Sequence, residues 1–226
     1  NSPYQPYSSF AGDDIYISVD KLVADGLLNQ SDAVEFKSNA TIVDYGAVRS
    51  HKTNMLQTAF ANFMSNSQLK AELDAFVAKT SWAYNYAVFV TFKKANQHKA
   101  WNLWPSEYKS WIKDKKLDLS AYKEQIDYEL FLQFIFSRQW LELKAYANSK
   151  NIEIMGDIPI YLGFDSLDVW ENQDMFLLDA EQNPTFMAGV PPDYFSVTGQ
   201  RWGNPIYNWE NLAKTNFKFW IDRLQG

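Results

Sequence analysis

The chain has 226 residues, a formal net charge of −6 and no cysteine, and 17% of its residues are aromatic. The lack of cysteine excludes a disulfide scaffold, a thiolate metal site and a cysteine nucleophile. Negative net charge argues against a large nucleic-acid surface, because phosphate binding depends on clustered Lys and Arg. No apolar stretch approaches the roughly 20 residues of a membrane span, and no signal peptide is visible. We therefore expect a protein that binds neither membranes nor nucleic acid, and the lack of cysteine permits a cytoplasmic location without proving it.

The first 50 residues predict loops and short elements. Residues 1–14 are dense in Pro, Ser, Gly and aromatic residues, a composition typical of a loop. Apolar and polar residues alternate over 15–20, which allows a short strand, and a short helix is expected to stop near Gly26. Residues 40–48 are rich in β-branched side chains and favour either a strand or an extended entry to a helix.

Residues 50–150 have mostly helical spacing of their apolar side chains. Ser65 and Gln68 have the spacing of a capping box at the start of a new helix. The run 87–92 has the propensity of a strand, but six residues do not separate a strand from a buried helix. Residues 120–149 predict a long helix that is apolar on most sides, so we expect it to be buried or wedged between partners.

The last third of the chain predicts a strand, a long loop and a final helix. Residues 151–163 give the strongest strand prediction, and they directly follow the long helix, as in an α/β sheet. Residues 189–205 contain six Gly and Pro residues, which predicts a long loop that is either functional or disordered. The aromatic residues in that loop argue against disorder. Apolar residues on one face of 217–224 predict the last helix.

Most common catalytic motifs are absent from the sequence. There is no HExxH, no calcium-binding loop, no GxGxxG or Walker A glycine loop and no GxSxG elbow. The two histidines are separated by 47 positions, so neither has an obvious partner for metal binding. We therefore expect no metal, no organic cofactor and no serine nucleophile.

Asp157 is the first candidate for a functional residue. It lies in MGDIPI, at the end of the predicted strand. In α/β barrels the carboxyl ends of the strands face the active site. The carboxylate of Asp157 therefore either binds polar groups of a ligand or caps the backbone that follows it.

The loop 189–205 is the second candidate. Flat aromatic rings pack against the C–H-rich faces of sugars, while amide and guanidinium groups bind sugar hydroxyls. The loop supplies this mixture of side chains: Tyr194, Phe195, Ser196, Gln200, Arg201, Trp202 and Asn204. Alternatively, the aromatic residues only fasten a long loop to the rest of the protein. The same choice applies to Tyr4 and Tyr7 near the N-terminus.

Three segments resemble the amylomaltase family, that is, the 4-α-glucanotransferases: SPYQPYSSFAG (2–12), GDIPIY (156–161) and the stretch from FDSLDVW to GNPIYNWE (164–210). AGVPPDYFS followed by TGQRWGNP within one loop is especially specific. The resemblance implies an α/β fold, a partial (β/α)8 TIM barrel with an inserted, mainly helical subdomain. It places parts of the barrel and loops near its first strands in 1–50, the inserted region in 51–149, and a barrel strand with an active-site lid loop and the following helix in 150–226.

The resemblance also implies an activity. Members of this family transfer segments of α-1,4-glucan between maltooligosaccharides by a retaining mechanism with two carboxylates and no cofactor. In the family, the nucleophile and the general acid follow the helix that here ends near Gly226, so we expect no catalytic residue in this chain. The chain begins with Asn rather than Met, and we expect an interior fragment that is inactive alone. A half barrel leaves strand edges unpaired, so we also expect self-association.

The resemblance assigns contacts with the glucan to eight residues: Tyr4, Asp157, Tyr194, Phe195, Ser196, Gln200, Trp202 and Asn204. Tyr4 resembles an aromatic residue that stacks on the donor glucose, and Asp157 resembles a sugar-binding carboxylate. Residues 194–196 resemble the tip of a mobile loop over the acceptor, and residues 200–204 its return leg. Such a lid excludes water and thereby favours transfer over hydrolysis.

Two other functions use the same residues. The first is a non-catalytic carbohydrate-binding module, in which the aromatic residues hold a sugar that is not transformed. The second is a purely structural α/β domain whose Gly- and Pro-rich loop binds nothing. Titration with maltooligosaccharides separates them, because only the structural domain predicts no saturable binding.

Overall fold

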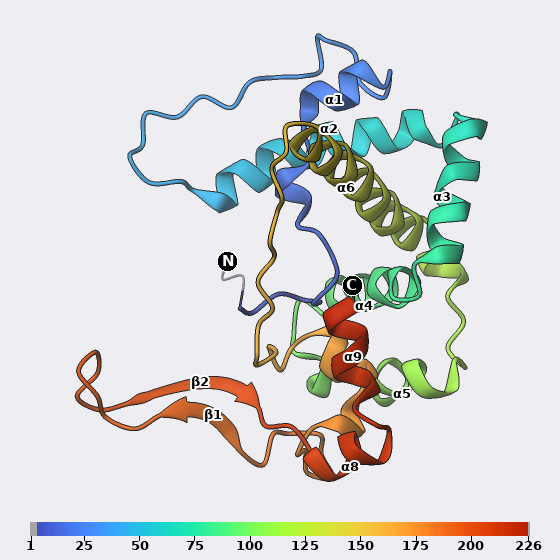
Figure 1. The fold of residues 1–226 in the computed structure, drawn as a ribbon. Coiled ribbons are helices and arrows are strands. Elements are labelled where there is room, and N and C mark those ends of the chain that lie inside the picture. Colours follow the sequence, from blue (N-terminus) through green and yellow to red (C-terminus); the bar gives the residue numbers. More distant parts are fainter. Residues whose placement is uncertain (1–3, 226) are drawn as a thin grey trace. The chain divides into compact units, whose positions relative to one another are not determined.

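The computed structural model describes residues 4–225. Helices dominate the described chain, and its strands form a single antiparallel pair (Figure 1). The α-helices are α1 (Val19–Ala24), α2 (Tyr45–Phe63), α3 (Ser67–Lys79), α4 (Ala83–Ala95), α5 (Ser106–Asp114), α6 (Lys123–Ser149), α7 (Leu167–Glu171), α8 (Trp209–Lys214) and α9 (Lys218–Gln225). The strands are β1 (Met187–Val190) and β2 (Gln200–Pro205). Short 3-10 turns are η1 (Asp14–Tyr16), η2 (Trp101–Leu103), η3 (Ser120–Tyr122) and η4 (Gln173–Met175).

The described chain divides into two compact units, each built from separate stretches of sequence. Unit 1 contains residues 4–11, 88–121 and 156–225, and unit 2 contains residues 12–87 and 122–155. The regions expected from the sequence, 1–50, 51–149 and 150–226, refer to the barrel of a longer protein and stay a prediction.

Unit 2 is a helical unit around a core of phenylalanine rings. The ring centroid of Phe63 on α2 lies 5.0 Å from that of Phe131 and 6.0 Å from that of Phe134, both on α6. Phe76 on α3 approaches Phe134 to 5.9 Å. Residues 130–135 of α6 are all buried, as expected for a helix that is apolar on most sides. The predicted long helix is therefore confirmed.

Two glutamines of α6 hold the segment that precedes α1. Gln133 accepts a hydrogen bond from the backbone N–H of Gly12 and donates one to its carbonyl, at 2.9 and 3.0 Å. Gln139 does the same with Ser18, at 2.6 and 3.2 Å. The strand considered for 15–20 is absent, because Ser18 caps α1 by accepting a hydrogen bond from the backbone N–H of Lys21. Local capping thus outweighs the alternating pattern.

Unit 1 has a core of large aromatic rings. Phe92 of α4 packs edge-to-face against Trp111 of α5 and Trp170 of α7, at 5.8 and 6.1 Å between ring centroids. The indole rings of Trp111 and Trp170 are stacked at 6.2 Å. Each buried indole N–H needs an acceptor, and that of Trp170 donates to the carbonyl of Lys109 at 3.1 Å. These contacts fix α4, α5 and α7 against one another.

The strongest strand prediction, 151–163, is wrong for the described structure. This segment carries no strand, and its apolar side chains at Ile152, Met155 and Ile160 are exposed. An alternating pattern makes a strand only where a neighbouring backbone pairs with it. Among residues 4–225, β1 and β2 are the only strands of a sheet, and they pair with each other.

The predicted long loop 189–205 is largely a hairpin. β1 and β2 pair antiparallel, with Gly189 opposite Arg201 and Val190 opposite Gln200. Gly199 has φ of +73°, and a Cβ there would lie 2.6 Å from the carbonyl oxygen of Val190. The turn therefore requires glycine at this position. Figure 1 shows the hairpin projecting from α8 and α9 of its own unit.

The remaining expectations hold with small corrections. Residues 40–44 form an irregular entry to α2 rather than a strand, and 87–92 lie within α4. The cap of α3 is Asn66, one residue after the predicted Ser65, and its side chain accepts from the backbone N–H of Leu69 at 3.0 Å. The last predicted helix is α9. Over residues 4–225, no helix has both the length and the apolar character that crossing a bilayer requires.

Candidate functional site

Two predicted site residues that are 153 positions apart in the sequence meet in unit 1. The hydroxyl of Tyr4 donates a hydrogen bond to Oδ2 of Asp157 at 3.2 Å, and both side chains are exposed. The next residue, Gln5, donates from Nε2 to the carbonyl of Trp202 at 3.4 Å. The structure therefore brings Tyr4, Asp157 and Trp202 into one neighbourhood.

The N-terminal segment is anchored by backbone contacts near α7. The backbone N–H of Leu167 donates to the carbonyl of Tyr7 at 2.8 Å, and that of Ser9 donates to Oδ2 of Asp168 at 2.9 Å. Burial raises the pKa of Asp168 above its ordinary value, although the hydrogen bond from Ser9 acts in the opposite direction. Tyr4 thus extends from a fixed anchor rather than from a free chain end.

Trp202 offers one flat face beside a second aromatic ring. Its indole N–H donates to Oε1 of Gln200 at 2.9 Å, which fixes the orientation of the ring. The ring of Tyr161 lies 6.2 Å from it between centroids. The side chain of Gln200 is therefore a partner of Trp202 as well as a predicted sugar contact.

Asn204 differs from the other predicted residues because it is buried, with only 6% of its surface exposed. Its Nδ2 donates to the carbonyl of Leu162 at 2.8 Å. In this structure the side-chain amide of Asn204 binds the backbone of Leu162. Its contact with the glucan stays a prediction.

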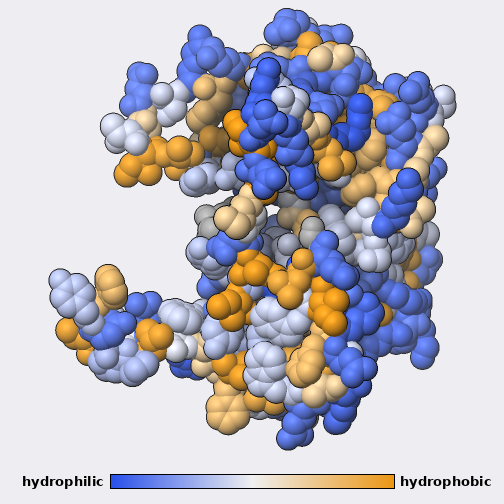
Figure 2. Space-filling model, in the orientation of Figure 1, coloured by the Kyte–Doolittle hydropathy of each residue, from blue (hydrophilic) through white to orange (hydrophobic). Residues whose placement is uncertain are grey.

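The tip of the hairpin forms a separate group of exposed side chains. Tyr194 is 96% exposed and Phe195 is 87% exposed, and their rings pack edge-to-face at 5.6 Å. Oδ1 of Asp193 accepts from the backbone N–H of Phe195 at 2.9 Å and of Ser196 at 2.8 Å. The hydroxyl of Ser196 donates to the carbonyl of Gly199 at 2.7 Å, so it closes the turn. Figures 1 and 2 show this end of the hairpin standing away from the rest of its unit.

Two residues beside the candidate site were not predicted. Gln5 follows Tyr4 in the SPYQ motif, so the motif itself was a signal for it. Tyr161 closes the GDIPIY motif and stacks on Tyr207 at 6.4 Å between ring centroids. Nothing in the sequence indicates that pair, because the partners are 46 positions apart.

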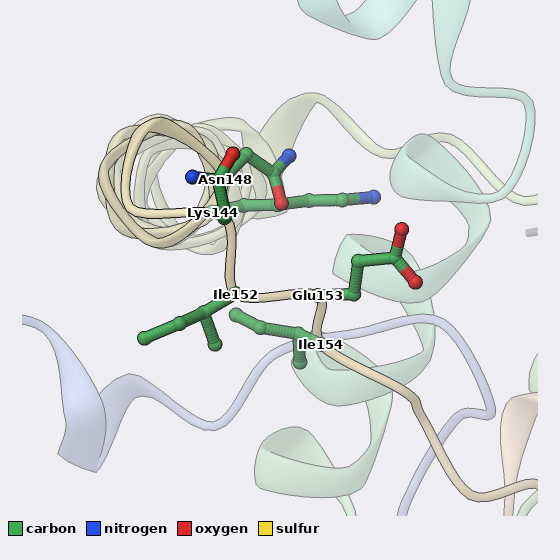
Figure 3. Close-up of a pocket in the computed structure, with 6 residues that line it drawn as sticks. Lys144, Asn148, Ile152, Glu153 and Ile154 are labelled. Carbon is green, nitrogen blue, oxygen red and sulfur yellow. The ribbon is translucent and has the colours of Figure 1, made fainter.

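A pocket of about 490 Å³ lies elsewhere, in unit 2 at the end of α6. Its lining is mostly polar: Lys144, Asn148, Asn151, Ile152, Glu153 and Ile154. Figure 3 shows Lys144 and Glu153 reaching in the same direction, while Ile152 points the opposite way. All six lining residues are exposed, and none belongs to the predicted site.

The described residues offer no cluster suited to a metal ion. Within 4–225, no three His, Cys, Asp or Glu side chains come together in a way that could hold one.

Comparison with known proteins identifies the family. The family model described as 4-alpha-glucanotransferase matches residues 1–226, which is the entire chain. The chain belongs to the 4-alpha-glucanotransferase family.

Relatives in this family are similar over the whole chain. A 4-alpha-glucanotransferase from Clostridium butyricum is 42% identical over 238 residues, covering 100% of this chain and 47% of the relative. The chloroplastic/amyloplastic 4-alpha-glucanotransferase of Solanum tuberosum is 35% identical over 99% of this chain and 40% of its own length. The chain thus spans less than half the length of these curated relatives. The organelle named for the potato enzyme leaves the cytoplasmic location a prediction.

Two solved amylomaltases are similar to this chain in fold. The amylomaltase from Streptococcus agalactiae, solved in complex with acarbose, is 36% identical with a TM-score of 0.93. That match covers 100% of this chain and 46% of the solved one. The amylomaltase from Corynebacterium glutamicum has a TM-score of 0.68 at 18% identity, covering 99% of this chain and 30% of its own, and shows similarity of fold.

Proposed function

We propose that the protein to which this chain belongs is a 4-α-glucanotransferase that moves segments of α-1,4-glucan between maltooligosaccharides in the cytoplasm. The observation that carries the proposal is the hydrogen bond between Tyr4 and Asp157 beside the carbonyl of Trp202. The bond joins the phenol of Tyr4 to the carboxylate of Asp157, and the neighbouring Gln5 binds the backbone of Trp202, within a chain of this family. The same groups would face a glucose unit with apolar planes and a hydrogen-bonding oxygen.

The described residues contribute to binding rather than to bond cleavage in this proposal. Tyr4 and Asp157 contact the donor sugar, while Tyr194, Phe195 and Ser196 cover the acceptor side. Gln200, Trp202 and Asn204 support the return of the lid. The reaction is retaining, with a nucleophile and a general acid on opposite sides of the scissile bond, in a (β/α)8 barrel of which this chain supplies part. We assign neither reacting carboxylate to residues 4–225.

The isolated chain is expected to be inactive and to associate with itself. Apolar side chains are exposed on the second half of α6 and on the segment that follows it, including Trp140, Leu143 and Met155. Large exposed apolar areas favour association in water. Mass photometry of the isolated chain should show dimers or larger species, and a clean monomer would contradict this expectation.

The test of the function uses the full-length protein and maltotriose. Wild type should release glucose and form maltopentaose and longer products. Trp202→Ala should lower kcat/KM several-fold, because it removes one aromatic face of the sugar site. Trp140→Ala is the matched control, because Trp140 in unit 2 is 41% exposed and Trp202 is 40% exposed.

The outcomes separate the alternatives. Saturable binding of maltotriose without any new product would favour the non-catalytic binding module. No saturable binding would favour the purely structural domain. Equal rates for Trp202→Ala and wild type would remove Trp202 from the site.

A further inference from the structure

The segment that follows Asp157 is held in an unusual way. Residues 157–162 lie outside any strand of the described structure, yet three of their carbonyls accept hydrogen bonds from side chains. Arg223 donates from Nη2 to Pro159 at 2.5 Å, and Tyr207 donates from its hydroxyl to Ile160 at 2.7 Å. Asn204 donates to Leu162 at 2.8 Å. Three side chains therefore donate hydrogen bonds to this segment, as the backbone of a neighbouring strand would.

Arg223 is the centre of this arrangement. It lies on α9 with only 6% of its surface exposed, and its Nη1 donates to the hydroxyl oxygen of Tyr207 at 3.2 Å. Its guanidinium lies over the rings of Trp220 and Phe219, at 4.8 and 5.7 Å from their centroids. The guanidinium thus binds a carbonyl, a hydroxyl and two aromatic faces at once.

Arg223 forms no close ion pair, although its charge acts on the carboxylate of Asp168, where burial raises the pKa and the guanidinium lowers it. Within the described chain, no carboxylate lies at ion-pair distance from it, and its buried Nε–H has no hydrogen-bond partner. The hydrogen bonds of Arg223 go to the carbonyl of Pro159 and to the hydroxyl of Tyr207, which in turn donates to the carbonyl of Ile160. We call Arg223 and Tyr207 the clamp.

The clamp acts next to Asp157. Pro159, whose carbonyl Arg223 holds, is two residues after Asp157, and Ile160 is three residues after it. A ligand-binding group needs to be held within a fraction of an ångström, and rigid neighbours provide this. Asp157 itself is exposed, with Tyr4 donating to its carboxylate, so its backbone is where the protein can fix it.

We infer that Tyr207 and Arg223 are positioning residues that hold the carboxylate of Asp157 in place for the glucan. The inference rests on the proposed function, because it takes Asp157 as a sugar-binding group. Neither residue contacts the sugar in this scheme, and each acts through the carbonyls of Pro159 and Ile160.

The test is a double-mutant cycle in the full-length protein, with binding of maltotriose measured by titration. Tyr207→Phe removes only the hydroxyl and keeps the ring, which packs at 5.2 Å from Phe176. The change removes two hydrogen bonds, the one from Tyr207 to Ile160 and the one from Arg223 to Tyr207, and the dissociation constant should rise at least about fivefold. In the Asp157→Asn background, Tyr207→Phe should raise the dissociation constant less than about twofold. Residues that act through one another give non-additive effects, and Tyr207 would act on the glucan only through Asp157. Tyr16→Phe, at an exposed tyrosine of unit 2, is the matched control.

A second readout needs no glucan. NMR order parameters of the backbone N–H groups of Asp157 and Ile160 should fall from about 0.85 towards 0.6 in Tyr207→Phe, and they should stay unchanged in Tyr16→Phe. Arg223→Lys keeps the positive charge but loses the two guanidinium N–H donors to Tyr207 and Pro159. It should lower the same order parameters by a similar amount.

Each outcome decides one point. Equal fold-changes for Tyr207→Phe in both backgrounds would overturn the positioning role, because a general loss of stability is additive. Unchanged glucan binding in Asp157→Asn alone would overturn the proposed role of Asp157. In that case the order parameters still test whether the clamp restrains the backbone of residues 157–160. Unchanged order parameters in Tyr207→Phe would show that it does not.

Discussion

The two ends of the β1–β2 hairpin belong to the same short stretch of sequence but are held in different ways. At the base, Asn204 is buried and binds the carbonyl of Leu162, 42 positions away. At the tip, Asp193 and Ser196 bond only to backbone within three residues, and Tyr194 is almost fully exposed. The base is therefore tied to the rest of unit 1, while the tip could change its conformation at little cost in stability. A binding site benefits from both, one part fixed and one part adaptable.

The largest effect should come from breaking the base. Asn204→Leu leaves the buried carbonyl of Leu162 without its donor, and an unsatisfied buried group costs about 2 kcal/mol. The free energy of unfolding should fall by this amount in urea titrations followed by circular dichroism. Asn29→Leu, at an exposed position of unit 2, serves as the control. A loss below about 0.5 kcal/mol would mean that the base is not anchored through this amide.

A smaller effect is expected at the turn between base and tip. Gly199→Ala should destabilise the hairpin by about 1–2 kcal/mol, because an alanine there combines a positive φ with a clash against the carbonyl of Val190. Gly203→Ala is the matched control, since Gly203 has φ of +80° but no atom within 4 Å of the added Cβ. Hydrogen exchange of the β1 and β2 amides should rise more in Gly199→Ala. Equal rises in hydrogen exchange in the two variants would show that the positive φ alone, and not the clash with Val190, destabilises the hairpin.

The anchor of the N-terminal segment should respond to pH. Because burial raises the pKa of Asp168, its contribution to stability is fully present below the ordinary value of 3.8 and is lost as the pH rises through the raised pKa. Asp168→Asn should remove this decline while its side-chain oxygen still accepts from Ser9. Unfolding free energies measured from pH 3.8 upward should therefore fall less steeply in the variant. Parallel curves would contradict the raised pKa.

The smallest effect on stability is expected at the tip. Phe195→Ala should change the free energy of unfolding by less than about 0.5 kcal/mol, since the ring is almost fully exposed. Transfer from maltotriose by the full-length protein should nevertheless fall several-fold if the tip covers the acceptor. A stability loss as large as that of Asn204→Leu would erase the contrast between the two ends of the hairpin.

Local patterns predicted the helices better than the strands. The helical spacing of apolar residues such as Phe60 and Phe63 suffices for α2, because each turn bonds within itself. The alternation of Ile152 and Ile154 does not suffice for a strand, because a strand needs a neighbouring backbone and none among residues 4–225 pairs with this segment. For the same reason, the pairing of Gly189 with Arg201 was not predicted from a segment that has the composition of a loop.

The candidate site was predicted by its motifs but not by its geometry. Tyr4 and Asp157 were both singled out, yet nothing in a sequence indicates a hydrogen bond across 153 positions. The clamp of Arg223 and Tyr207 was missed entirely. A single arginine on an amphipathic helix is usually exposed, and only the packing of Trp220 and Phe219 shows that this one is buried.

The discontinuous course of the chain has a consequence for folding during synthesis. Unit 2 is complete once residue 155 has left the ribosome, so its phenylalanine core can close early. Tyr4 leaves first of all the described residues but meets Asp157 only after both stretches of unit 2 have been made. The side chain of Tyr4 therefore stays without this partner until a residue 153 positions later has been translated. Contacts of such long sequence separation form slowly, so we expect the contact between Tyr4 and Asp157 to be among the last to form.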